Sequence, residues 1–180
     1  MRLLFYDDRS LATGLADGEA PIFLAGPTSQ ACRTHWRIEA LELLESRGFT
    51  GAVILPEFRD RAFSEVAANH FAGEICPVPG MHPVSYNILK WETYGIEHAS
   101  CVLFWMPFVL TREGDLDSLP GFTTRAEVSR ELTRDPDRIV LGMPADALSS
   151  AHIRYHAYFR GVPIHETLTK TVDAALSILT

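Results

Sequence analysis

The sequence lacks the features that mark several large classes of protein. Its 180 residues contain no apolar run long enough to cross a bilayer, so we expect no membrane partner. The apolar start, residues 1–6, meets Asp7 and Asp8 at once and is too short for the core of a secretory signal. We find no repeat, low-complexity tract or linker, and the length suits one domain spanning residues 1–180.

Basic residues are scattered and outnumbered. Sixteen lysine and arginine residues stand against 23 aspartate and glutamate residues, which gives a formal net charge of −7. A protein that holds polymeric nucleic acid by its phosphates needs a basic stripe, so we expect no such partner. A single nucleoside or nucleotide needs only one or two donors, and this charge is compatible with it.

Residues that form disulfides or bind metals are also few. The three cysteines, Cys32, Cys76 and Cys101, form neither a CxxC pair nor an even framework. They are typical of reduced thiols, which predicts a cytoplasmic protein. His152 and His156 stand one helical turn apart, but no third ligand accompanies them, so we expect a surface pair and no metal.

Short apolar strands alternate with helical segments along the rest of the chain. The strands are expected at residues 22–25, 52–55, 101–105, 139–143 and 162–165. The helices are expected at about residues 29–47, 84–99, 123–133, 149–159 and 168–179. This alternation predicts an α/β fold, a parallel sheet covered by helices on both faces. Residues 1–19 are expected to add a small hairpin.

Four of these strands end in a proline within a residue or two, which marks abrupt exits at one edge of the sheet. Ligands of open parallel sheets bind at the carboxyl edge. The sequence therefore predicts a site built from residues 26–29, 56–60, 105–108 and the helix start at Thr123. Two long stretches, residues 59–83 and 108–122, leave from the same edge and are interpreted as lids.

The turn after the first predicted strand has a glycine that allows close backbone approach. Gly26 precedes a predicted helix, whose N-terminus would offer free N–H groups to an anion. The segment is neither a P-loop nor a GxGxxG turn. A tight strand-to-helix turn explains it equally well.

Glu127 is the strongest candidate for chemistry. Thr123 and Thr124 can cap the predicted helix while presenting hydroxyl groups to a ligand. Glu127 falls in about the first turn, where the helix dipole favours the ionised carboxylate that a nucleophile requires. The alternative is a capping box, because Thr124 and Glu127 have its spacing, and spacing alone favours it.

Glu92, in the middle of a predicted helix, could meet Glu127 across the site. Glycosyl chemistry commonly uses two carboxyl groups, one attacking the anomeric carbon and the other moving protons. The alternative is a solvated glutamate on the helix face. Trp105 could stack a nucleobase or belong to the core, and Trp36 and Arg37 carry the same ambiguity.

Six segments, taken in order, resemble the nucleoside 2-deoxyribosyltransferase family and its relatives that hydrolyse nucleotide N-glycosidic bonds. They are residues 22–27, 36–40, 55–57, 91–99, 102–107 and 123–127, within roughly residues 21–145. The resemblance implies a flavodoxin-like or Rossmann-like fold. It also implies an enzyme that cleaves or exchanges the N-glycosidic bond of a small nucleoside or nucleotide, and a homodimer or larger assembly.

The resemblance further implies roles for residues. Glu127 would attack C1′ to form a covalent glycosyl-enzyme, and Glu92 would be the second acidic residue, with no cofactor required. The substrate-binding positions would be Gly26, Pro27, Thr28, Ser29, Arg37, Pro56, Glu57, Trp105, Thr123, Thr124 and Arg125. Many transferases carry an aspartate shortly before the nucleophile, where this chain has residues 119–122, so transfer and hydrolysis both stay open. A nucleotide sensor without turnover is the alternative.

Overall fold

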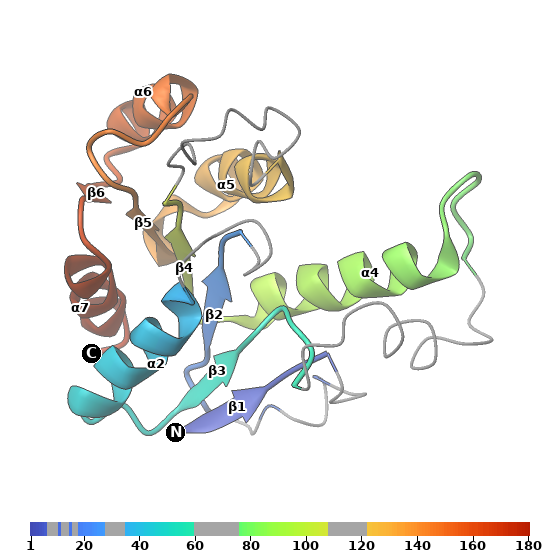
Figure 1. The fold of residues 1–180 in the computed structure, drawn as a ribbon, viewed down its shortest axis with the longest axis horizontal. Coiled ribbons are helices and arrows are strands. Elements are labelled where there is room, and N and C mark those ends of the chain that lie inside the picture. Colours follow the sequence, from blue (N-terminus) through green and yellow to red (C-terminus); the bar gives the residue numbers. More distant parts are fainter. Residues whose placement is uncertain (7–10, 12–14, 16–17, 28–34, 60–75, 108–121) are drawn as a thin grey trace.

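The computed structural model describes residues 1–6, 11, 15, 18–27, 35–59, 76–107 and 122–180, which form a sheet between two layers of helices (Figure 1). The strands are β1 (Arg2–Leu4), β2 (Ile22–Ala25), β3 (Ala52–Ile54), β4 (Cys101–Trp105), β5 (Ile139–Gly142) and β6 (Ile164–His165). The helices are α2 (Trp36–Ser46), α4 (Pro83–His98), α5 (Phe122–Arg134), the 3-10 turn η2 (Pro136–Arg138), α6 (Ala151–Arg160) and α7 (Leu168–Ile178). None of these helices is both long and apolar enough to span a bilayer.

The six strands are all parallel and lie in the order β1-β3-β2-β4-β5-β6. Without β1, this is the order of a flavodoxin-like doubly wound sheet, which confirms the predicted fold class. The winding reverses between β2 and β4, because the chain runs from β2 outward to β3 and then crosses back to β4. The carboxyl ends of strands at such a reversal form the crevice in which ligands bind.

The two faces of the sheet bury different sets of side chains. Ile22 and Leu24 of β2 pack with α2 and α7, whereas Phe23 and Ala25 pack with α4, α5 and α6. This alternation follows from the two-residue period of a strand. Both faces are covered, so the strands are apolar throughout, and this property made them recognisable in the sequence.

The predicted strands and most predicted helices are confirmed. β2 and β4 have the predicted bounds, and β3, β5, β6, α4, α6 and α7 differ from the prediction by one or two residues at an end. Gly48 ends α2 as expected, with a φ of 76° and its N–H donating to the carbonyl of Glu45. The two predicted lids lie largely outside the described residues.

Two expectations for the N-terminal third are wrong. Residues 2–4 are not part of a hairpin but form β1, which pairs in parallel with β3 in the register Arg2 to Ala52. The apolar run at the start instead covers the edge of β3. The helix expected from residue 29 begins at Trp36, with His35 outside it. Thr28 and Ser29 lie outside the described residues.

We expect Gly95→Ala to destabilise the fold, because α4 lies on the sheet at this glycine. An added Cβ would stand 2.8 Å from Cε2 of Phe23, whose side chain is buried. Alanine gains about 1 kcal/mol in helix propensity, whereas overpacking a core costs about 1–3 kcal/mol. Unfolding in urea should therefore show a net loss of roughly 1 kcal/mol. Ser85→Ala, at an exposed position of the same helix, is the control, and an unchanged or more stable Gly95→Ala would contradict this packing.

Candidate active site

Two carboxyl groups that interact electrostatically lie on helices covering the same face of the sheet. Glu92 lies on α4 and Glu127 on α5, and both helices cover the face that carries Phe23 and Phe104. Burial raises the pKa of Glu127 to about 8, and the negative charge of Glu92 is the second cause of this rise. Burial also raises the pKa of Glu92. The two side chains therefore interact, and the pair retains a proton more readily than exposed glutamates do.

Arg37 supplies a fixed positive charge to this pair. The side chain is buried, and its nitrogens donate to the carbonyls of Leu24 at 3.2 Å, Gly26 at 2.7 Å and Pro27 at 3.3 Å. Its charge lowers the pKa of Glu92 and of Glu127, against the larger effect of burial. The end of β2 therefore positions a cation beside the two carboxyl groups.

Gly26 is required by close packing at the winding reversal. An added Cβ would stand 2.4 Å from the carbonyl oxygen of Trp105 and 2.7 Å from Cζ2 of Trp36. Pro27 is buried, and its carbonyl also accepts from Nε1 of Trp36 at 3.0 Å. α2 itself begins at Trp36. Residues 28–34 lie outside the described residues, so the helix N-terminus expected directly after this turn stays a prediction.

The beginning of α5 also differs from the expectation. The helix starts at Phe122, so Thr123 and Thr124 lie inside it and neither is the N-cap residue. Thr123 is exposed and Thr124 is buried. Glu127 therefore lies in the second turn, which rules out the capping box and weakens the helix dipole. The pKa of Glu127 is raised, not lowered, because burial and the charge of Glu92 outweigh the charges of Arg130 and Arg37.

Tyr6 belongs to the site, although no local pattern in the sequence indicated it. Its side chain is 2% exposed, and its hydroxyl donates to Oε1 of Glu92. The ring packs 5.0 Å from that of Phe58 and 4.8 Å from that of Trp91. Among the described residues, Nε1 of Trp91 is a buried donor with no hydrogen-bond partner. Tyr6 and Glu92 are 86 positions apart, so only the fold brings them together.

The remaining predicted binding residues are not all on this face. Trp105 belongs to the core under α2 and α7, where a Cβ on Gly142 would stand 2.6 Å from its ring. Of the two interpretations of Trp105, base stacking and a core position, the core position is the one that the structure shows. Arg125 donates to the carbonyls of Ser149 at 2.6 Å and Leu148 at 3.0 Å.

Pro56 and Glu57 lie beside the Tyr6 segment. Pro56 is buried, and the carbonyl of Glu57 accepts from the backbone N–H of Tyr6 at 3.1 Å. Substrate binding by Pro56, Glu57 and Arg125 stays a prediction.

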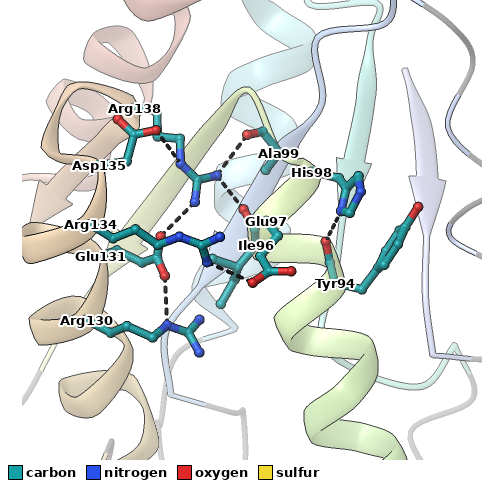
Figure 2. A network of polar contacts seen from close by, with 10 residues as sticks. All are labelled: Tyr94, Ile96, Glu97, His98, Ala99, Arg130, Glu131, Arg134, Asp135 and Arg138. Atoms are coloured by element: carbon teal, nitrogen blue, oxygen red, sulfur yellow. Dashed lines mark hydrogen bonds and ion pairs between the residues drawn. The ribbon is translucent and has the colours of Figure 1, made fainter.

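A buried ion-pair network joins α4 to α5 (Figure 2). Glu131 is fully buried and accepts from Arg138 at 2.7 Å and from Arg130 at 2.8 Å. Arg138 also donates to the carbonyls of Ile96 and Ala99, so it caps the C-terminal end of α4. Glu127 and Glu131 are one turn apart on α5. The network therefore sets the position of α5 against the helix that carries Glu92.

The described residues contain no group of three or more histidine, cysteine or acidic side chains placed to hold a metal ion. His152 and His156 are exposed, with Nε2 atoms 3.1 Å apart. No protein-family model matches the chain, and no curated protein is significantly similar to it. The arrangement itself offers two interacting carboxyl groups, a fixed cation and a buried phenol, which suits proton transfer and attack on an electrophilic carbon.

We expect Arg138→Met to destabilise the protein by about 3 kcal/mol, because it leaves the buried charge of Glu131 poorly paired and uncaps α4. Arg134→Met is the matched control, since Arg134 pairs with Glu97 at 2.8 Å on the surface. Surface ion pairs contribute little to stability. Urea unfolding of both variants measures the difference. Equal losses in the two variants would contradict a special role for the buried pair.

Proposed function

We propose that this chain cleaves or exchanges the N-glycosidic bond of a small nucleoside or nucleotide. The observation that carries this proposal is the pair Glu92 and Glu127, partly buried at the winding reversal with the charge of Arg37 beside it. Enzymes that cleave glycosidic bonds commonly use two carboxyl groups as their catalytic groups. The order of the six segments that resemble nucleoside 2-deoxyribosyltransferases supports the same reaction.

Glu127 is the proposed nucleophile. Its ionised oxygen attacks C1′ through an oxocarbenium-like transition state, the C1′–N bond breaks, and the departing base takes up a proton. The resulting glycosyl ester passes the sugar either to a second base or to water. Glu92 positions the sugar or moves the proton. No cofactor takes part in this scheme, and a homodimer or larger assembly is proposed with it.

One observation favours a second candidate function, a sensor that binds a nucleotide without turnover. Because the pKa of Glu127 is about 8, this group is mostly protonated at neutral pH. A neutral carboxyl group donates a hydrogen bond to a ligand but is a poor nucleophile. The two candidates differ in whether free base appears.

We expect Glu127→Gln to abolish release and exchange of bases, with a loss on the order of a thousandfold or more. The purified protein is incubated with nucleosides and 5′-nucleotides, with and without an acceptor base, and the bases are separated by chromatography. Glu97→Gln, an exposed position on α4, is the control and should retain activity. Ligand binding without any turnover would favour the sensor, and full activity of Glu127→Gln would exclude this residue as the nucleophile.

We expect kcat/KM of the active protein to rise with pH up to about 8, by roughly tenfold per unit below that value. The reason is that only the ionised form of Glu127 attacks, and its pKa lies near 8 in the free protein. Initial rates across a pH series measure the rise. A flat profile between about pH 5 and 8 would contradict it.

Unfolding provides a control that does not depend on turnover. Burial raises the pKa of Glu127 from its ordinary 4.5 to about 8, so the folded state binds the proton more tightly than the unfolded chain. The contribution of this proton to the free energy of unfolding is fully present below pH 4.5 and is lost as pH rises through about 8. Glu127→Gln should lack this loss in urea unfolding measured on both sides of that interval.

A further inference from the structure

The edge strand β1 brings Tyr6 to the candidate site from outside the five-stranded flavodoxin-like order. Two backbone hydrogen bonds fix its position against the segment that follows β3: Leu4 accepts from the N–H of Leu55 at 2.8 Å, and the N–H of Tyr6 donates to the carbonyl of Glu57 at 3.1 Å. Phe58 and Trp91 hold the ring from the loop after β3 and from α4. These contacts hold the phenol where its hydroxyl donates to Oε1 of Glu92.

The hydroxyl of Tyr6 acts on Glu92 as a donor. Burial raises the pKa of Tyr6 well above 10.0, and the charge of Glu92 raises it further, so the phenol keeps its proton. A donor that keeps its proton stabilises the ionised form of its acceptor. The positive charge of Arg37 on α2 also favours the ionised form of Glu92.

The surroundings of Glu127 favour its ionised form less than those of Glu92 do. The groups that act on it are Glu92 from α4, Arg37 from α2, and Arg130 and Glu131 from α5. Arg37 and Arg130 favour its ionised form, whereas Glu92 and Glu131 oppose it, and burial is the largest effect. Two neighbouring carboxyl groups do not both ionise easily, so an ionised Glu92 keeps the proton on Glu127.

We propose that Tyr6 is a positioning residue that holds the negative charge on Glu92 and thereby keeps the proton of the site on Glu127 in the ligand-free protein. The catalytic consequence rests on the proposed function; the protonation states do not. In this ligand-free state the nucleophile Glu127 is protonated and therefore unreactive. Glu127 becomes reactive when pH rises, or when a ligand that disturbs the contact between Tyr6 and Glu92 lets the proton move to Glu92.

The first test is made without substrate. Carboxyl-carbon NMR of protein labelled on glutamate follows the titration of Glu92 and Glu127, whose signals are assigned with Glu92→Gln and Glu127→Gln. In Tyr6→Phe, the pKa of Glu92 should rise and that of Glu127 should fall below its value of about 8. Glu92→Gln should also lower the pKa of Glu127, since it removes the charge that opposes ionisation.

Tyr94→Phe is the matched control, because it removes a phenol hydroxyl from α4, the helix that carries Glu92. The ring of Tyr94 stacks 3.8 Å from that of His98. This substitution should leave both titrations unchanged. Simple loosening of the fold would expose both carboxyl groups and lower both pKa values together, so opposite shifts identify the positioning role. Unchanged titrations in Tyr6→Phe, or a shift of both values in the same direction, would overturn the proposal.

The second test is the pH profile of turnover. In Tyr6→Phe the rising limb of kcat/KM should move to lower pH, whatever happens to the maximal rate, whereas Tyr94→Phe should keep the position of the wild-type limb. Opposite NMR shifts without any turnover would support Tyr6 as a positioning residue and defeat the proposed glycosyl reaction. Turnover that depends on Glu127 with unmoved titrations would defeat the role of Tyr6 alone.

Discussion

The buried contact between Glu131 and Arg138 governs how the two helices of the candidate site lie together. Removing a carboxylate from water costs several kcal/mol unless a well-placed partner compensates it. Arg138 provides that partner at 2.7 Å, and the same guanidinium closes the end of α4 by binding its last carbonyls. Because α4 carries Glu92 and α5 carries Glu127, the spacing of the carboxyl pair depends on these contacts of Arg138.

The site lies where the direction of winding changes, and backbone packing there leaves little freedom. Gly26 is so close to the carbonyl of Trp105 that no side chain fits. The carbonyls of Leu24, Gly26 and Pro27 hold Arg37, so main-chain atoms position the cation of the site. Its charge lowers the pKa of both carboxyl groups, against the larger effect of burial.

Sequence reasoning succeeded where one local property determines the structure. The strands at residues 22–25 and 101–105 were found because a strand buried on both faces must be apolar throughout. It failed where the outcome depends on a distant partner. Residues 2–4 were assigned to a hairpin, yet they pair with β3, about 50 positions away. The start of α2 was placed at residue 29 because no local signal reports that Trp36 and Arg37 anchor its first turn on the end of β2.

For the site, the residue types along the chain were enough to indicate which side chains carry the chemical groups, and the order of strands and helices placed α4 and α5 on the same sheet. The protonation state of these groups follows only from the fold. Spacing suggested a capping box and an ionised Glu127, whereas burial and the nearby charge of Glu92 raise its pKa to about 8. Tyr6 carried no signal at all, because desolvation and long-range charge depend on what the fold places around a side chain, and no local pattern encodes that.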